Sequence, residues 1–131
     1  MSENKHNQNK HTVLLVDDEE DLLRVLGAEI VDAGYDVATA TDGHEALAVL
    51  QQKQFDVILL DVNMPKVSGM QVLQFVTQSY PKSKVIMLTG LDDVKVALEA
   101  KRYGAHDFVT KPYILEDLLM KIHDAAGGTA P

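Results

Sequence analysis

The chain has 131 residues, which is the length of a single domain. Hydrophobic residues make up 46% of it and aromatic residues only 5%, so we expect an aliphatic core, and the absence of cysteine excludes disulfides, thiolate metal sites and cysteine catalysis. The 12 basic and 20 acidic residues give a formal net charge of −8, which argues against nucleic-acid binding by this domain alone.

Residues 1–11 are polar and show no apolar periodicity, so they are predicted to form a disordered N-terminal arm. The histidines in this arm, His6 and His11, fit a solvated tail better than a metal site. The sequence shows no signal-peptide pattern, and no apolar run approaches the length of a membrane span. We therefore expect a soluble, cytoplasmic protein with no membrane partner.

The first half of the chain alternates apolar strands with amphipathic helices. Residues 12–16 are apolar without polar alternation, which predicts a strand buried on both faces, as in a parallel sheet. This strand ends in the acidic run 17–21, and a helical pattern closed by Gly34 follows. A weaker strand is predicted at 35–40, and a turn at 41–43 precedes a second helix.

The second half repeats this alternation three more times. The predicted strands are residues 57–60, 84–88 and 106–110. The predicted helices are one between the loop 66–69 and Tyr80-Pro81, one over about 92–103, and one with an apolar stripe from Ile114 to Ile122 that ends at Gly127-Gly128. Five strand-helix pairs predict an α/β fold, a doubly wound five-stranded parallel sheet with helices on both sides. The domain is expected to span 12–126, followed by a flexible tail at 127–131.

Polar side chains stand where four of the predicted strands end. Asp17 and Asp18 follow the first strand, Asp61 follows the third, Thr89 ends the fourth and Lys111 follows the fifth. Because the carboxyl ends of parallel strands share one edge of the sheet, we expect these residues to converge there. Each residue alone also has a structural explanation as a helix cap, a turn former or a solvated charge. Their coincidence at the ends of four strands favours a functional site.

The residue types in this set indicate phosphoryl chemistry. Three clustered carboxylates are costly to hold together without a cation, and oxygen ligands without His or Cys suit Mg²⁺ or Mn²⁺. Asp61 is the predicted nucleophile, because a carboxylate can accept a phosphoryl group as an acyl phosphate. The metal and the Lys111 ammonium would stabilise charge on the transferring oxygens, and the Thr89 hydroxyl could donate a hydrogen bond to one of them.

From residue 12 to about 126 the chain resembles a response-regulator receiver domain of bacterial two-component signalling. The motifs that carry the resemblance are Val16-Asp17-Asp18, the run Leu60-Asp61-Val62-Asn63-Met64-Pro65 with Gly69 four residues later, Leu88-Thr89-Gly90 and Phe108-Val109-Thr110-Lys111-Pro112. The family has a flavodoxin-like fold with strand order 2-1-3-4-5. The resemblance therefore implies the same architecture that the alternation of elements predicts.

The resemblance also implies a role for each residue at the sheet edge. Asp61 would receive a phosphoryl group from the phosphohistidine of a sensor histidine kinase or of a phosphotransfer protein. Asp18 and Asp61 would bind Mg²⁺ through their side chains, Asn63 through its backbone carbonyl, and Asp17 through water. The protein would assist its own phosphorylation and dephosphorylation, and no turnover of an external substrate is expected.

A conformational switch is a further implication of the resemblance. Lys111 would pair with Asp61 or its phosphate, and Thr89 would swing toward the phosphoryl group. The aromatic switch position falls on Phe108, which has no hydroxyl and would act by rotamer packing near Thr89. The downstream partner would bind the face made by the helix at 92–103, the strand at 106–110 and the last helix. Candidate residues on that face are Val94, Lys95, Leu98, Tyr103, His106 and Tyr113.

Two other classes of protein share parts of this pattern. A phosphatase of the haloacid dehalogenase type also ends a strand with a nucleophilic Asp, but it needs a second Asp two residues later, and position 63 is Asn. A flavin- or nucleotide-binding protein would have a glycine-rich phosphate loop after the first strand, where this chain has acids. Whether the chain is a stand-alone regulator or a receiver excised from a longer protein stays open, as do its cognate kinase and output.

Overall fold

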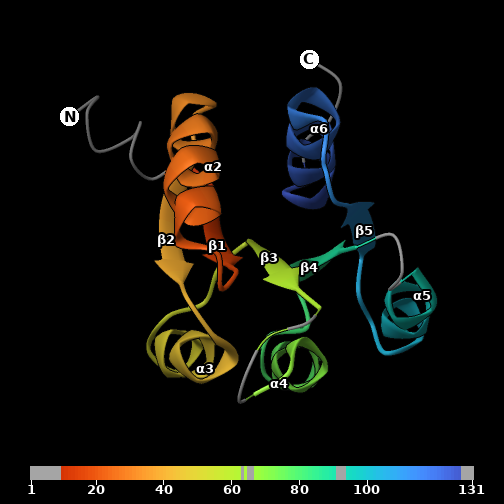
Figure 1. The fold of residues 1–131 in the computed structure, drawn as a ribbon. Helices are drawn as coiled ribbons and strands as arrows, with labels where there is room; N and C mark the ends of the chain where they lie inside the picture. The colour runs from red at the N-terminus through yellow and green to blue at the C-terminus, as the bar shows by residue number, and fades with distance from the viewer. Residues whose placement is uncertain (1–9, 63, 65–66, 91–93, 128–131) are drawn as a thin grey trace.

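The computed structural model describes residues 10–62, 64, 67–90 and 94–127, and these residues form a sheet between two layers of helices (Figure 1). The strands are β1 (Thr12–Val16), β2 (Asp36–Ala40), β3 (Val57–Asp61), β4 (Lys84–Thr89) and β5 (Asp107–Thr110). The helices are α2 (Glu20–Asp32), α3 (Gly43–Gln52), α4 (Gly69–Ser79), α5 (Val94–Arg102) and α6 (Leu115–Ala125). Helices α2 and α6 cover one face of the sheet, and α3, α4 and α5 cover the other (Figure 1).

The sheet has the strand order β2-β1-β3-β4-β5, and every neighbouring pair is parallel. The predicted doubly wound, flavodoxin-like α/β fold is therefore confirmed. Every residue of β3 is buried, because this central strand has a strand on either side and helices above and below it. A parallel sheet covered on both faces needs such uninterrupted apolar strands, which is why β1, β3 and β4 lack polar alternation.

Successive residues of each strand supply two separate cores. Leu14, Leu60 and Met87 pack against α3, α4 and α5, whereas Leu15 and Leu59 pack against α2 and α6. The register of the strands aligns these residues, since Leu14 is opposite Ile58 and Leu60 is opposite Met87. Both cores are almost wholly aliphatic, as the composition predicts. The two layers hold the central strands in place, so the carboxyl ends of β1, β3 and β4 are fixed relative to one another.

Two helices begin at glycines that the sequence analysis placed in a loop and in a turn. Gly69 was expected in the loop 66–69, but it is the first residue of α4, because Ser68 forms a capping box with Gln71. Gly43 was expected in the turn 41–43, but it is the first residue of α3, where the Asp42 side chain accepts a hydrogen bond from the backbone N–H of Glu45 at 2.7 Å.

The remaining element bounds agree with the sequence analysis to within one or two residues. The predicted start of a helix at residue 92 lies outside the described residues, as do most of the predicted arm 1–11 and tail 127–131. The described part of the chain contains no helix that is both long and apolar enough to cross a membrane. Whether the protein is cytoplasmic, and whether the domain ends at 126, stay predictions.

Candidate functional site

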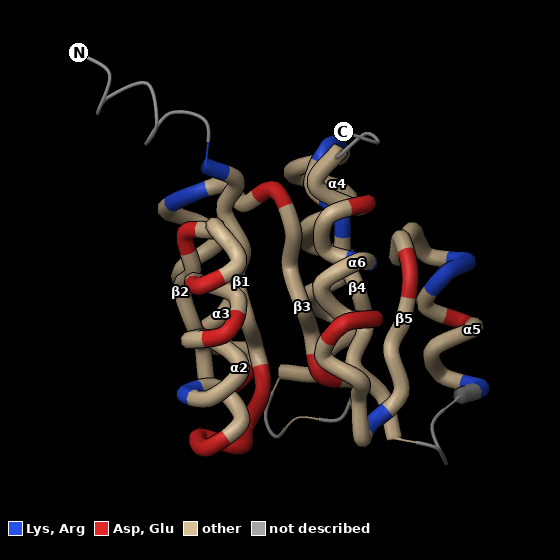
Figure 2. The backbone as a smooth tube through the Cα atoms, turned by 90° about the horizontal axis from the view of Figure 1, so that it is seen from above, with Lys and Arg blue, Asp and Glu red and all other residues tan. Residues whose placement is uncertain are grey.

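The carboxyl ends of β1, β3 and β5 bring three aspartates and one lysine together. Asp17 and Asp18 follow β1, Asp61 is the last residue of β3, and Lys111 follows β5. Carboxylate oxygens of Asp17, Asp18 and Asp61 all lie within 4.8 Å of one another. Acidic positions also gather in Figure 2 where β1 runs into α2. The structure thus brings together the four charged residues that the strand ends predict.

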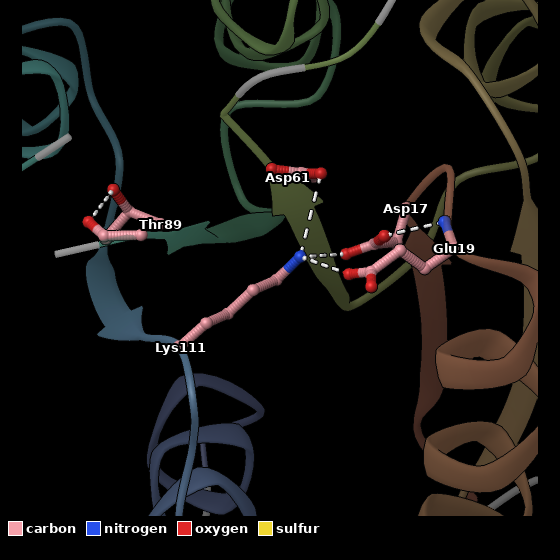
Figure 3. A network of polar contacts seen from close by, with 6 residues as sticks. Asp17, Glu19, Asp61, Thr89 and Lys111 are labelled. Atoms are coloured by element: carbon pink, nitrogen blue, oxygen red, sulfur yellow. Dashed lines mark hydrogen bonds and ion pairs between the residues drawn. The ribbon is translucent and has the colours of Figure 1, made fainter. Parts of the chain in front are cut away.

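Lys111 extends from the end of β5 across the edge of the sheet toward the other charged residues (Figure 3). Its ammonium nitrogen Nζ lies 2.7 Å from Asp17 Oδ2, 3.2 Å from Glu19 Oε1 and 3.7 Å from Asp61 Oδ2. The shortest contact is therefore made with Asp17, whereas the resemblance pairs Lys111 with Asp61. An ammonium has three N–H donors, so it can serve several carboxylates at once.

Asp17 is the most buried member of the site, with no exposed surface. Its two carboxylate oxygens have separate partners: Oδ2 accepts a hydrogen bond from Lys111, and Oδ1 accepts one from the backbone N–H of Glu19 at 2.9 Å. A fully buried carboxylate is tolerated only when it is paired and hydrogen-bonded in this way. Both carboxylate oxygens of Asp17 are therefore engaged within the protein.

Glu19 is the residue of this site that the sequence analysis missed as a contributor. It occupies the N-cap position of α2, yet its side chain makes no capping hydrogen bond and contacts Lys111 instead. The sequence holds one weak signal for this role, since Ser, Thr, Asp and Asn are the usual N-cap residues and Glu is not. Only the structure shows that the end of β5 lies close enough to α2 for the contact.

The pKa of Lys111 is raised by its surroundings. Partial burial of the ammonium acts to lower the pKa, but the hydrogen bond to Asp17 and the negative charges of Asp61 and Asp17 act more strongly in the opposite direction, with Glu19 adding to them. Lys111 is therefore a permanent positive charge at neutral pH. It can neutralise part of the acidic cluster and attract an anionic group toward Asp61.

The donor set of the cluster fits a hard divalent cation. Asp17 and Asp61 are buried, Asp18 is exposed, and their oxygens can close around one ion. Among the described residues no His or Cys joins this group, and carboxylate oxygens are the ligands that Mg²⁺ and Mn²⁺ prefer. The expected fourth contributor, the backbone carbonyl of Asn63, lies outside the described residues.

Thr89 and Phe108 occupy the two neighbouring strands beside this cluster. Thr89 ends β4 with 1% of its surface exposed, and its hydroxyl donates a hydrogen bond to the carbonyl oxygen of Gly90 at 3.1 Å. Phe108 lies in β5 opposite Met87, is half-buried and packs against the core on the α3–α4–α5 side. The Lys111-Pro112 peptide bond is cis.

The face made by α5, β5 and α6 exposes several large apolar side chains. Leu98, Tyr103, Ile114 and Met120 are each at least half exposed. A hollow of about 270 Å³ lies between β5 and α6 and is lined in part by Tyr113. Of the other residues predicted for this face, Lys95 is exposed, His106 is half-buried beside Asp124, and the side chain of Val94 lies outside the description.

Comparison with known proteins places the chain in one family. The model of the response regulator receiver domain matches residues 13–123. The chain is 38% identical over 120 residues to the probable transcriptional regulator ycf27 of Cyanidium caldarium, covering 92% of this chain and 48% of that protein. It is 36% identical over 119 residues to the transcriptional regulatory protein GlrR of Escherichia coli strain K12, covering 91% of this chain and 27% of that protein.

Solved receiver domains have the same fold. A response regulator receiver domain protein from Clostridium thermocellum superposes with a TM-score of 0.85 at 32% identity, covering 89% of this chain and 94% of that one. The receiver domain of the Francisella response regulator 1452 gives a TM-score of 0.82 at 27% identity, covering 90% of this chain and 98% of that one.

The chain spans between about a quarter and half of the length of the curated relatives it matches, which are transcriptional regulators. The matched family is neither of the alternative classes that the sequence left open. Its members are signalling components of two-component systems. By sequence and by fold, the chain belongs to the response regulator receiver domain family.

Proposed function

We propose that the protein is a phosphorylation-controlled switch in which Asp61 accepts a phosphoryl group from the phosphohistidine of a histidine kinase or phosphotransfer protein. The observation that carries this proposal is the position of Lys111, whose ammonium lies between the buried Asp17 and Asp61 inside a cluster of three carboxylates. A lysine so held is poised to receive the negative charge of a phosphoryl group on Asp61.

The transfer forms one bond and breaks another. An oxygen of Asp61 bonds to phosphorus while the P–N bond to the donor imidazole breaks, and the imidazole nitrogen keeps the electron pair and takes up a proton. The product is an acyl phosphate on Asp61 and a neutral histidine on the donor. Lys111, whose Nζ lies 3.7 Å from Asp61 Oδ2, would then form an ion pair with a phosphoryl oxygen.

Mg²⁺ is the proposed cofactor, with Mn²⁺ as a substitute. Asp18 and Asp61 would hold it through their side chains, the backbone carbonyl of Asn63 would complete the protein ligands, and Asp17 would act through water. When bound, the ion supplies charge neutralisation for the transferring oxygens. Asp17 fits its indirect role, because its own oxygens are engaged by Lys111 and by the N–H of Glu19.

The phosphoryl group would change the conformation through Thr89 and Phe108. The Thr89 hydroxyl now donates to the Gly90 carbonyl, and it would give up this bond for a phosphoryl oxygen. The space that Thr89 leaves would be filled by Phe108 from the adjacent strand. Phosphate adds nearly two negative charges at pH 7. That charge would shift the population toward the state in which Thr89 and Phe108 have moved.

The downstream partner or output domain would bind the α5–β5–α6 face. The exposed Leu98, Tyr103 and Ile114 and the hollow beside Tyr113 support this assignment. This face includes β5, which precedes Lys111 and contains Phe108, so the switch residues are continuous with it. The transcriptional regulators among the relatives make an output domain the expected recipient of the signal.

Phosphorylation with a small donor tests the proposal. The protein is incubated with acetyl phosphate and Mg²⁺, and the intact mass is measured. We expect an increase equal to one phosphoryl group, which chelation of the metal prevents. Asp61→Asn should abolish the increase, whereas Asp36→Asn, which changes an exposed aspartate at the start of β2, should leave it unchanged. An equal mass increase in Asp61→Asn would refute the assignment of the acceptor.

A further inference from the structure

Gly43 was predicted to be a turn residue, but in the structure it is the lack of space for a side chain, not a turn conformation, that requires glycine. It is the first residue of α3, and its backbone is outside the left-handed region that favours glycine. What excludes a side chain is space: a Cβ on Gly43 would overlap the carbonyl oxygen of Val67 and would lie 2.8 Å from the carbonyl carbon and the Cβ of Val67. Real Cβ contacts are not this short, so a methyl group here requires the backbone to move.

Val67 belongs to the segment that connects Asp61 to α4. Val67 comes six positions after Asp61 and two positions before Gly69, the first residue of α4. Gly69 is constrained in the same way, because a Cβ there would overlap the carbonyl oxygen of Asp61 itself. Residues 67–69 therefore lie against the start of α3 at one end and against the backbone of Asp61 at the other.

The starts of α3 and α4, which lie on either side of Val67, are both held by hydrogen bonds. Asp42 caps α3 through the N–H of Glu45, and the Glu45 carboxylate accepts a hydrogen bond from the N–H of Thr41 at 2.7 Å. Ser68 and Gln71 form the reciprocal capping box of α4. Because each helix start is fixed by its own hydrogen bonds, neither can yield easily when a methyl group is inserted between them.

We infer that Gly43 is a positioning residue for the phosphoacceptor site: the start of α3 supports Val67, Val67 leads directly into the start of α4, and Gly69 there lies against the carbonyl oxygen of Asp61. A change 18 residues before Asp61 in the sequence, on a helix that supplies no ligand, should then weaken metal binding and phosphorylation. The inference rests on the proposed function of Asp61, and it adds α3 to the elements that shape the site.

The test compares Gly43→Ala with a matched control, Gly27→Ala. Gly27 is also a buried glycine on a helix, but a Cβ there would meet only Thr39 Cγ2 at 3.9 Å, an ordinary van der Waals contact. Three quantities are measured below the melting temperature of each variant. They are the Mg²⁺ affinity by calorimetry, the phosphorylation rate with acetyl phosphate, and the amide NMR chemical shifts of Asp61 and Val62 in the absence of metal. The amide shifts, which are measured without metal, separate the proposal from a failure of metal binding alone.

We expect Gly43→Ala to lower the Mg²⁺ affinity and the phosphorylation rate by at least about tenfold, because a displacement of about one ångström in a catalytic constellation can cost on the order of a hundredfold. It should also shift the amides of Asp61 and Val62. Gly27→Ala should stay within twofold of the parent in both quantities. A folded Gly43→Ala protein with parental Mg²⁺ affinity and rate would overturn the inference.

A second variant keeps the test valid if Gly43→Ala does not fold. Val67→Gly leaves the sequence of α3 unchanged, but it removes the Val67 side chain that faces Gly43 and frees the backbone at position 67. It should also lower the Mg²⁺ affinity and the phosphorylation rate, and parental values in this variant would equally overturn the inference. Failure of the proposed function looks different, because the parent itself would then gain no phosphoryl group on Asp61, whatever residue occupies position 43.

Discussion

Two lysines near the end of the chain form ion pairs of similar length in very different surroundings. Lys111 lies 2.7 Å from Asp17, whose side chain is completely buried, and Lys111 itself is 23% exposed. Lys121 lies 3.0 Å from Asp107, with the two side chains 37% and 28% exposed. The first pair joins the ends of β5 and β1, and the second joins α6 to the edge strand β5.

Burial makes the two pairs differ in what they do. Water screens the Lys121–Asp107 pair, so it can contribute little to stability. The Lys111–Asp17 pair is shielded from water and includes two more carboxylates, Glu19 and Asp61, around the same ammonium. Charge concentrated in this way favours binding of a cation and a phosphoryl group, and it makes each member depend on the others.

Removal of the Lys111 ammonium should have the largest effect on stability and on phosphorylation. Lys111→Met leaves Asp17 buried with only the Glu19 N–H as its partner, so the free energy of unfolding should fall by about 3 kcal/mol in the absence of divalent cations. Urea unfolding in the presence of a chelator measures this loss. Added Mg²⁺ should restore part of it, because the ion replaces the missing positive charge. Phosphorylation by acetyl phosphate should be reduced by at least about a hundredfold.

Glu19→Gln tests the contact between Glu19 and Lys111, because it removes one carboxylate from the surroundings of Lys111 without exposing Asp17. The Glu19 side chain is 63% exposed, so its pair with Lys111 is worth about 1 kcal/mol or less. With this competitor gone, Lys111 should engage the phosphoryl group more readily, and the phosphorylation rate should rise by roughly two- to fivefold.

The matched control for this variant is Glu20→Gln, which removes the same charge from the neighbouring exposed residue in the first turn of α2. The described contacts of Lys111 do not include Glu20. Equal changes of rate in the two variants would mean that the general field around the site, rather than the contact with Lys111, sets the rate.

Lys121→Met should have a small effect on stability and none on phosphorylation. Loss of this screened pair is expected to lower the free energy of unfolding by about 0.5 kcal/mol. The measurement is the same urea series used for Lys111→Met, followed by the acetyl phosphate assay. A loss as large as that of Lys111→Met would show that burial is not what separates the two pairs.

The two pairs should also respond at opposite ends of the pH range. Burial acts to raise the pKa of Asp107, but hydrogen bonds from the Phe108 N–H and Lys121, with the charges of Lys121 and Lys101, lower it overall. The stability that Asp107 contributes is therefore present above its unfolded pKa of about 3.9 and is lost as the pH falls through its lower folded pKa. Asp107→Asn should make the acid limb of the stability curve slightly shallower, as measured by thermal unfolding between pH 5 and 2, roughly the window of a carboxyl titration.

The stability that Lys111 contributes has the opposite dependence on pH. Its folded pKa is raised, so its contribution is complete below the unfolded pKa of about 10.4 and is lost as the pH rises through the folded value. Lys111→Met should therefore flatten the alkaline limb of the stability curve. An alkaline limb as steep as that of the parent would contradict the assignment of the raised pKa to this lysine.

Much of the fold was predictable because the signals are local. The buried strands are recognisable as apolar runs without polar alternation, and the helices are recognisable as apolar stripes with regular spacing. The errors occurred at helix starts: Gly69 looked like a loop residue and Gly43 like a turn residue. Glycine is permissive in a turn and is also the only residue that allows close approach of two backbones, and the sequence does not distinguish the two uses.

The charged groups at the carboxyl ends of the strands could be identified from hydrophobic periodicity, because the periodicity marks where each strand ends. How those groups pair depends on the packing of the whole domain. Lys111 is closest to Asp17 and also contacts Glu19, and both partners are more than 90 residues away in the chain. The path of the segment after β5 and the position of the α2 N-cap set those distances. Neither is encoded in a local pattern, because both depend on how five strands and two helical layers pack together.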